Sequence, residues 1–345
     1  MVARFKMKNP GHNRILVIRT DRIGDVVLAT PLIRSLRQTF PQAYIAALVA
    51  PYAKDVLAGN PHLNEILVDA PTMNFWQQTA LLRKHKFDTA LLLHPTERLT
   101  WMIFAAGIRT RVTVGLRLNQ VLTFMHTVSR KKYIEGRHEA DYCLDLGRKI
   151  GVQTSDLATE VFLSEEERKS GRERVQSLGK RQVVCLHPGS GASAPNWRVE
   201  RYVDLARILL QESDVGIVLT GSAQERIHGD AFKTLQSDRL INVMGELDLR
   251  GLMGVLSQAS VVVSASTGPM HLAAALKVPT VSMFCPLPAC APSLWGPQGN
   301  RSAILLPHDN YCQGECPGDP HRCEFEGGIT PKQVARAVQV MLGPF

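Results

Sequence analysis

The sequence predicts an α/β protein built from two Rossmann-like domains with parallel sheets, which face each other across a cleft. Short apolar segments rich in branched residues alternate with longer segments of helical periodicity along most of the chain. The predicted strands, such as the one in "TALLLH", are almost continuously apolar, which is typical of a parallel sheet covered on both faces. A length of 345 residues exceeds one ordinary core and suits two domains, which we expect at 1–160 and 161–345.

The N-terminal half begins with a strand and continues as alternating helices and strands. We expect strands at residues 15–19, 44–49, 65–68, 89–93 and 111–114. We expect helices at residues 31–39, 52–57, 75–86 and 98–106. Thr30 and Pro31 are typical of a helix start, because proline is favoured in the first helical turn. Gly24 and Asp25 therefore belong either to a turn or to a first helical turn that Pro31 kinks.

The C-terminal half repeats the alternation. We expect strands at residues 182–186, 216–220, 240–243, 260–264 and 280–284. We expect helices at residues 199–211, 224–235, 249–258 and 268–276. Between the halves the strand pattern is lost, so we expect a hinge at 152–165, followed by a charged helix that the capping box of Ser164 and Glu167 begins. A last helix at 331–342 has Thr330 as its N-cap.

Charge and hydropathy narrow the class of partner and the cellular location. The formal net charge of +9 fits either an anionic partner or a need for solubility alone. Basic residues are dispersed with little aromatic interleaving, which disfavours nucleic acid as the partner. No apolar run is long enough for a spanning helix, and the basic segment "MVARFKMKNPGHNR" lacks the apolar core of a signal peptide. We therefore expect a cytoplasmic protein.

The cysteines fall into two groups. Isolated cysteines in apolar or mixed surroundings are expected to be free thiols, and they are Cys143, Cys185, Cys285 and Cys290. Three others share a loop that also contains His308 and His321, and they are Cys312, Cys316 and Cys323. Their spacing differs from the familiar paired zinc patterns, so a surface loop is favoured over a metal site and no metal is expected.

The segment "VVVSASTGPMHLAAALKVPTVSMF" predicts an anion-binding helix N-terminus. A buried strand is followed by a loop of small residues and then by an alanine-rich helix. Such a helix presents free N–H groups and the positive end of its dipole to a ligand. Ser266 and Thr267 add hydroxyl donors, Gly268 opens the helix, and His271 lies in its first turn. The alternative is an ordinary capped helix with a surface histidine.

Two further loops in this half follow predicted strands. In "VVCLHPGSGASAPNW", Gly189 and Ser190 belong to a flexible backbone able to wrap a phosphate, although the Gly-Lys-Ser/Thr ending of a P-loop is missing. In "GIVLTGSAQER", Thr220 and Gly221 end a strand, and Glu225 could accept hydrogen bonds from ribose hydroxyls or could be an exposed helix residue. Together the loops predict a pyrophosphate with a nucleoside attached, neutralised without a metal. A nicotinamide oxidoreductase is disfavoured, because the glycine-rich fingerprint is missing.

Several motifs occur in an order that resembles a known family. They are "IRTDRIGDVVLATPLIRSLRQTFPQAYIAALV", "LAGNPHLNEIL", "HPGSGASAPNWRVERYVDLARIL", "VLTGSAQE", "STGPMHLAAALKVPTVSMF" and "WGPQG". They are similar to the lipopolysaccharide heptosyltransferases, the ADP-heptose-dependent family 9 of glycosyltransferases. The resemblance runs from about residue 14 to the final helix. It implies a GT-B fold and an inverting transfer from ADP-heptose that needs no metal or other cofactor.

The resemblance also implies roles for individual residues. Asp25 would be the general base, and Gly24 beside it would make room for the acceptor sugar. The donor would be held by Gly189, Ser190, Thr220, Gly221, Glu225, Ser266, Thr267, Gly268 and His271. The acceptor, lipid A–Kdo or a heptosylated core, would meet a basic face, formed by Arg98, Arg109, Arg111 and Arg117, unless these arginines are merely solvated. Peripheral contact with the cytoplasmic face of the inner membrane would follow, with no nucleic acid partner.

Two positions depart from the family pattern. Many members have an aspartate where this chain has Ser266, and many have a lysine two residues before Trp197, where this chain has Pro195. One change removes a carboxylate and the other a cation, so the two losses are opposite in sign. They leave two alternatives open, a GT-B transferase that uses another nucleotide sugar and a weakly active or non-catalytic nucleotide-sugar-binding paralogue.

Overall fold

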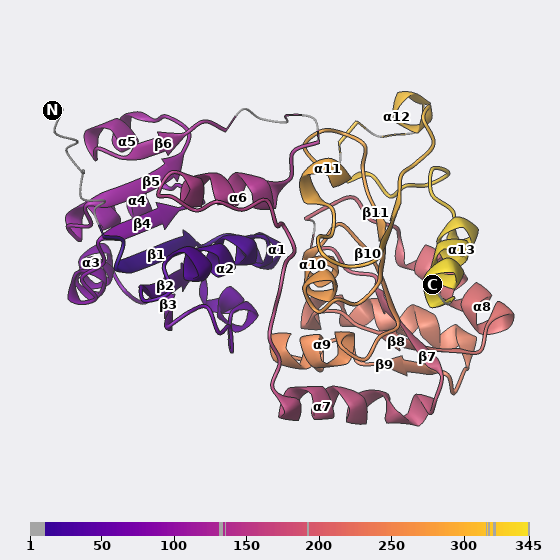
Figure 1. Ribbon diagram of the computed structural model, residues 1–345. Coiled ribbons are helices and arrows are strands. Elements are labelled where there is room, and N and C mark those ends of the chain that lie inside the picture. The colour runs from indigo at the N-terminus through magenta and orange to yellow at the C-terminus, as the bar shows by residue number, and fades with distance from the viewer. Residues whose placement is uncertain are drawn as a thin grey trace, which may run out of the picture.

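The computed structural model describes residues 11–130, 134, 136–191, 193–314, 316, 318–319 and 322–343. Within these residues the chain forms two six-stranded parallel sheets that lie side by side, each with helices on both faces (Figure 1). The strand orders are β3-β2-β1-β4-β5-β6 and β12-β11-β10-β7-β8-β9, which is one topology used twice. The prediction of two Rossmann-like parallel sheets is confirmed.

The N-terminal sheet is formed by residues 14–128. Its strands are β1 (Arg14–Arg19), β2 (Tyr44–Val49), β3 (Glu65–Val68), β4 (Thr89–Leu92), β5 (Thr110–Val114) and β6 (His126–Val128). The helices of this half are α1 (Ile23–Leu28), α2 (Thr30–Thr39), the 3-10 helix η1 (Pro51–Val56), α3 (Phe75–Lys84), α4 (Glu97–Ala105), α5 (Leu118–Leu122) and α6 (Glu139–Arg148). Gly24 and Asp25 lie in the first turn of α1, so the helical alternative is correct and the turn is wrong. The sequence did not predict β6, α5 or α6.

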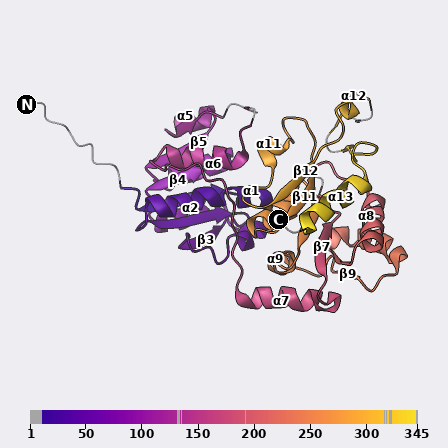
Figure 2. The same ribbon diagram turned by 45° about the vertical axis from the view of Figure 1, so that its right-hand side comes forward.

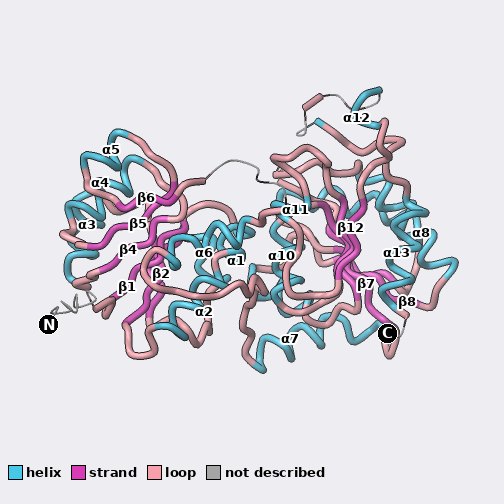
Figure 3. The backbone as a smooth tube through the Cα atoms, turned by 45° about the horizontal axis from the view of Figure 1, so that its top comes forward, coloured by secondary structure: helices cyan, strands magenta, loops and turns pink. Residues whose placement is uncertain are grey.

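Side chains of β1 alternate between two helical layers. Ile15 and Val17 belong to the cluster that contains residues of α1, α2 and α6, whereas Leu16 and Ile18 pack with residues of α3 and α4. Figure 3 shows α3, α4 and α5 on the outer face of this sheet, and α1, α2 and α6 on the face toward the C-terminal half. Burial on both faces explains the continuous apolar strands in the sequence.

The C-terminal sheet is formed by residues 182–305. Its strands are β7 (Gln182–His187), β8 (Val215–Leu219), β9 (Leu240–Asn242), β10 (Val261–Ala265), β11 (Thr280–Met283) and β12 (Ser302–Leu305). Its helices are α7 (Glu165–Val175), η2 (Gln176–Leu178), α8 (Val199–Glu212), η3 (Ala223–Leu235), α9 (Leu249–Leu256), α10 (Gly268–Ala275), α11 (Pro292–Trp295), α12 (Tyr311–Gly314) and α13 (Pro331–Leu342). The predicted capping box at Ser164 begins α7, and the predicted N-cap Thr330 begins α13. The sequence did not predict β12, α11 or α12.

Residues 149–163 carry the chain from α6 to α7 as neither helix nor strand (Figure 1 and Figure 2). Arg34 of the N-terminal half donates to the Ala158 carbonyl oxygen at 2.9 Å, and Lys277 of the C-terminal half donates to the Thr159 carbonyl oxygen at 2.7 Å. Both halves therefore hold the crossing segment. The hinge at 152–165 and the domain boundary at 160/161 stay predictions.

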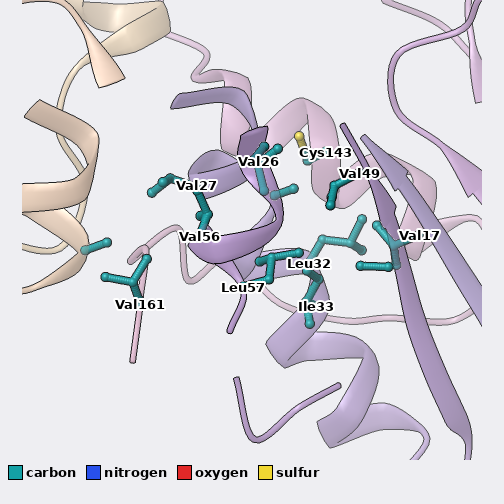
Figure 4. Close-up of a cluster of buried hydrophobic side chains, with 14 of the residues drawn as sticks. Val17, Val26, Val27, Leu32, Ile33, Val49, Val56, Leu57, Cys143 and Val161 are labelled. Atoms are coloured by element: carbon teal, nitrogen blue, oxygen red, sulfur yellow. The ribbon is translucent and has the colours of Figure 1, made fainter. Parts of the chain in front are cut away.

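One apolar cluster connects the two halves. Figure 4 shows Val26 and Val27 of α1 close to Leu32 and to Val56. The same cluster includes Leu272 of α10, so α1 packs on its own half and on the facing one. Among the described residues, no helix is both long enough and apolar enough to cross a bilayer.

Candidate active site

The two halves meet at the N-terminal turns of α1 and α10. In each sheet the strand order reverses beside its central pair, β1 with β4 and β7 with β10, which is where open parallel sheets bind ligands. A Cβ atom on Gly24 would lie 2.7 Å from His271 Cδ2, and one on Gly268 would lie 3.4 Å from Ile23 Cγ2. The glycine of the Gly-Asp pair is therefore required by the close approach of α10.

Two cavities lie beside this contact. The larger cavity, of about 490 Å³, and the smaller cavity, of about 330 Å³, share Arg22, Gly24, Ser193, Thr267 and Gly268 in their linings. The larger cavity is also lined by Gly189, Ser190, Gly221 and Glu225 from the predicted donor loops. The smaller cavity adds Asp25, Ser266 and His271. The structure thus brings Asp25 and the small-residue loop of α10 to one space.

Asp25 belongs to a buried network of charges. Arg19, which is 4% exposed, forms ion pairs with Asp25, with Asp21 at 2.7 Å and with Glu139 at 3.1 Å. Glu139 also pairs with Arg130. Burial raises the pKa of Glu139 and of Asp21 above their ordinary values, although the arginines oppose the shift. Three carboxylates thus share two guanidinium groups, which leaves negative charge beside the cavity.

His271, a buried histidine of α10, lines the smaller cavity from the C-terminal half, whereas Asp25 lines it from the N-terminal half. Burial, with help from His138 nearby, lowers the pKa of His271 to about 4, although Asp25 favours the charged form. Its imidazole is therefore neutral near pH 7. Within the described part of the chain, His271 Nδ1 has no hydrogen-bond partner. A buried polar atom without a partner beside a cavity is a candidate contact for a ligand.

Glu225 holds the loop that contains Gly189. Its carboxylate accepts hydrogen bonds from Gly191 N–H at 3.3 Å, from Ser222 N–H at 2.8 Å and from Ser222 Oγ at 2.9 Å. A Cβ atom on Gly189 would overlap this carboxylate. Burial raises the pKa of Glu225, but the hydrogen bonds from Ser222 and the nearby His187 outweigh it and lower the pKa. The loop is thereby fixed with its backbone at the cavity wall.

Thr220 lies behind the cavity wall. It is fully buried, and its hydroxyl is 2.9 Å from His187 Nδ1. His187 lines the larger cavity at the end of β7, and burial lowers its pKa to about 4. Apolar side chains complete that cavity, namely Leu247, Leu249, Leu252 and Leu272. The larger cavity thus combines an apolar wall with a polar loop.

An outer cavity of about 350 Å³ lies on the N-terminal side. It is lined by His94, Arg117 and Arg130, and it shares Ala289 and Trp295 with the smaller cavity. The structure therefore places Arg117 along a path that leads toward Asp25. Arg98 is exposed and pairs with Asp69.

Arg111 differs from the other arginines of the expected basic face. It is 8% exposed, and its guanidinium donates to the carbonyl oxygens of Ile108 and Thr123. Burial lowers its pKa. The expectation that Arg111 belongs to an anion-binding face is wrong, because its guanidinium is buried and bonded to backbone carbonyl oxygens.

Comparison with known proteins places these cavities in a family. A family model described as "Glycosyltransferase family 9 (heptosyltransferase)" matches residues 75–317. The chain belongs to this family. It is therefore a glycosyltransferase.

Named relatives are similar to this chain over most of its length. It is 25% identical over 299 residues to a "Putative glycosyltransferase" of Haemophilus influenzae, covering 82% of this chain and 86% of the relative. It is 24% identical to "Lipopolysaccharide heptosyltransferase 2" of Escherichia coli K12, covering 95% and 98%. The crystal structure of a family 9 glycosyl transferase from Veillonella parvula superposes with a TM-score of 0.81 at 22% identity, covering 96% and 97%. The fold is GT-B, as the sequence predicted.

Residues that sequence reasoning missed complete this family 9 site. Arg19 and Glu139 are distant in sequence, and only the folded sheet shows that they meet beside Asp25. His187 was detectable, because it ends the apolar strand in "VVCLHPG" and immediately precedes a predicted donor loop. Trp295 and Cys290 come from the stretch after β11 where the periodicity is weak.

The cysteines are free thiols. Within the described residues, no group of three or more His, Cys, Asp or Glu side chains is placed to hold a metal ion. Cys143, Cys185, Cys285 and Cys323 are buried free thiols, whereas Cys290 is half-buried and lines the smaller cavity. Cys312 and Cys316 pack against the C-terminal core. His321 lies outside the described residues.

Proposed function

We propose that this glycosyltransferase moves heptose from ADP-heptose to the inner core of a lipopolysaccharide precursor, with inversion and without a metal. The observation that carries the proposal is the shared cavity in which Asp25 faces the N-terminal turn of α10 and His271. The family and the names of several relatives, which are lipopolysaccharide heptosyltransferases, support the choice of sugar and acceptor. The remaining steps follow from the residues on each wall.

The donor is proposed to occupy the larger cavity. Its apolar wall suits an adenine ring, and the backbone at Gly189 and Ser190 suits the phosphates. Among the described residues no side chain caps α10, so its N-terminal N–H groups and dipole can stabilise charge on the departing diphosphate. Ser266, Thr267 and His271 Nδ1 can add polar contacts. These groups supply the stabilisation that a metal would otherwise provide.

The chemical step is proposed to be a single displacement. The acceptor oxygen attacks the anomeric carbon while the bond from that carbon to the diphosphate oxygen breaks, and the electron pair leaves with ADP. Asp25 takes the acceptor's proton. Arg19 holds the Asp25 carboxylate in place through an ion pair, and its guanidinium is itself held by Asp21 and Glu139. Arg19 is thus a positioning residue for the base.

The acceptor is proposed to enter from the outer cavity. Arg117 lies there beside His94 and Arg130, and phosphate or Kdo carboxylate groups would complement their charge. Arg98, exposed farther along the same edge, would add a contact if its pair with Asp69 opened. The enzyme would work at the cytoplasmic face of the inner membrane, where the lipid-linked acceptor is exposed.

A second candidate donor follows from the two departures from the family pattern. Pro195 and Ser266 both line the smaller cavity, so both changes face the place where the sugar would lie. This favours a transferase that uses another nucleotide sugar as the second candidate, ahead of a non-catalytic paralogue, since Asp25 and its network are intact.

An assay of sugar transfer tests these proposals together. The purified chain is incubated with truncated lipopolysaccharides and with ADP-heptose, ADP-glucose or UDP-sugars, each with and without EDTA. We expect a heptosylated product from ADP-heptose, with inverted anomeric configuration by NMR and an unchanged rate in EDTA. Faster transfer from another nucleotide sugar would show that this sugar nucleotide, and not ADP-heptose, is the donor. Loss of activity in EDTA that Mg²⁺ restores would contradict the metal-independent step.

A further inference from the structure

A row of apolar side chains projects from α5 and its flanks. Leu116, Leu118, Val121, Leu122 and Phe124 are each between 52% and 75% exposed. We call these five side chains the α5 ridge. Single exposed apolar residues are normal on protein surfaces, but a contiguous exposed patch marks a site of interaction. The ridge lies at the outer edge of the N-terminal sheet, at the end of the molecule opposite α7 (Figure 1 and Figure 2).

Buried polar residues of α5 and its C-cap anchor the helix to the fold, and its apolar side chains remain exposed. Gln120 is fully buried and donates to the Val114 carbonyl oxygen at 3.1 Å, and the buried Thr123 donates to the Asn119 carbonyl oxygen at 2.7 Å. Phe124 follows the end of α5 with a φ of +52°, and the N–H groups of Phe124 and Met125 donate to the carbonyl oxygens of Val121 and Gln120, each at 3.0 Å. This hydrogen-bonded helix end leaves the Phe124 side chain 75% exposed.

The surroundings of the α5 ridge are basic. Between Glu97 and Glu135 the sequence contains no Asp or Glu. Arg117 is the N-cap residue of α5, and the buried Arg111 bonds to the carbonyl oxygens of both Arg109 and Thr123, which places Arg109 beside the other end of the helix. Arg109 and Arg117 are both exposed, and neither forms an ion pair within the described residues. An apolar ridge with a free cation at each end complements an anionic lipid surface.

The α5 ridge is also continuous with the acceptor side of the site. Arg117 stands between Leu116 and Leu118 in the chain and lines the outer cavity. That cavity shares Ala289 and Trp295 with the smaller cavity, which contains Asp25. A molecule anchored in a bilayer at the ridge would therefore have its polar part directed along these cavities toward the proposed base.

We propose that the α5 ridge inserts into the surface of an anionic bilayer while Arg109 and Arg117 bind headgroup phosphates. The enzyme would thereby present the outer cavity to the membrane, where the sugar of a lipid-linked acceptor enters. The importance of this orientation rests on the proposed function, whereas the docking itself requires neither donor nor transfer. A second copy of the chain fits less well, because a symmetric contact would bring the arginines of both copies together without nearby acids.

Vesicle binding tests the proposal. The full-length protein is sedimented with phosphatidylcholine vesicles that contain or lack phosphatidylglycerol, in the absence of donor and acceptor. The variant Leu118→Ser/Leu122→Ser is compared with Ile227→Ser/Val340→Ser, whose side chains are 73% and 65% exposed in the C-terminal half. We expect the ridge variant to partition about tenfold less to anionic vesicles and the control to bind as the wild type does. Arg109→Gln should weaken binding mainly at low salt.

Equal binding by the ridge variant and the wild type would overturn the proposal. So would sedimentation velocity that shows a wild-type dimer dissociated by the ridge substitutions, with no vesicle binding by either protein. Transfer to a water-soluble, deacylated acceptor separates docking from catalysis, because the ridge variant should retain the wild-type rate there. Vesicle binding through the ridge by a protein without heptosyl transfer would leave the docking surface standing and would refute the proposed function alone.

Discussion

The first helical turn after β1 in the N-terminal half and the predicted donor loops of the C-terminal half occupy equivalent places in the same topology. After β1 the chain enters α1, whose first turn carries a carboxylate in an ion-paired network, whereas the segments after β7 and β10 are rich in glycine, serine and threonine. The difference shows that strand order selects where ligands bind, while the loop residues decide which charge each wall presents. The cavity wall formed by the N-terminal half, the N-terminal wall, retains negative charge. The C-terminal wall, formed by the other half, offers hydrogen-bond donors.

Removal of Arg19 should disrupt the N-terminal wall most. In Arg19→Met, the carboxylates of Asp21, Asp25 and Glu139 would lose their shared buried partner, so the free energy of unfolding should fall by about 3–5 kcal/mol. The matched control is Arg174→Met, because Arg174 forms an exposed pair with Glu246 and should cost about 0–1 kcal/mol. Urea denaturation of both variants measures the difference. Equal losses would mean that the network does not stabilise this wall.

The C-terminal wall should respond to a single methyl group. In Gly189→Ala the new Cβ atom overlaps the Glu225 carboxylate, so the loop must move away from the donor. We expect the KM for the donor to rise about 10- to 100-fold with a smaller change in stability. Gly314→Ala is the control, because a Cβ atom there meets nothing within 4 Å. Steady-state kinetics that show the same KM for both variants would argue against this loop as the phosphate site.

Two buried histidines of the C-terminal wall should share one pH response. Burial lowers the pKa of both His187 and His271 to about 4, from an ordinary value of 6.5. Between these values the unfolded chain binds the proton that the folded chain excludes. The free energy of unfolding should therefore decrease as the pH falls from 6.5 to 4, by about 1.4 kcal/mol per pH unit for each histidine. Denaturation at several pH values should show a shallower slope for His271→Gln, and an unchanged slope would contradict the shift.

Alanine substitutions at the two glycines where the halves meet should have the smallest effects, and the effect at Gly24 should exceed the effect at Gly268. A Cβ atom on Gly24 would lie 2.7 Å from His271, whereas one on Gly268 would lie at an ordinary distance of 3.4 Å from Ile23. We expect Gly24→Ala to lower kcat about tenfold and Gly268→Ala to change it by about twofold. Single-turnover rates for the two variants test this order. The reverse order would place the critical contact on the donor side.

Much of the architecture could be predicted, because both sheets are buried on two faces and their strands are therefore apolar throughout. The helix starts at Ser164 and Thr330 could also be predicted, because a capping residue lies next to its helix in the sequence. β6, which has three residues, and α5, which has five, are too short for a periodic signal. The helical turn at Gly24 was left open from sequence, since its decisive contact is with α10.

The site was less predictable than the fold. Loop residues such as Gly189 and Ser266 follow strands and could be found by position alone, and both line the cavities. Thr220 was expected beside them, but its hydroxyl turns inward to His187. In the sequence, nothing distinguishes Arg19 from other strand residues. Only the fold brings it to Glu139, which lies 120 positions away. Long-range charge pairs of this kind leave no local pattern.

The comparison of the two walls depends on Asp25, and one pair of variants tests it most directly. Asp25→Asn and Asp21→Asn each remove one carboxylate from Arg19, but Asp25 lines the smaller cavity. With ADP-heptose and a truncated lipopolysaccharide, kcat should fall about 100- to 10,000-fold in Asp25→Asn and far less in Asp21→Asn. ADP should bind both variants as tightly as the wild type by calorimetry. Wild-type turnover by Asp25→Asn would contradict the role of Asp25 as the base.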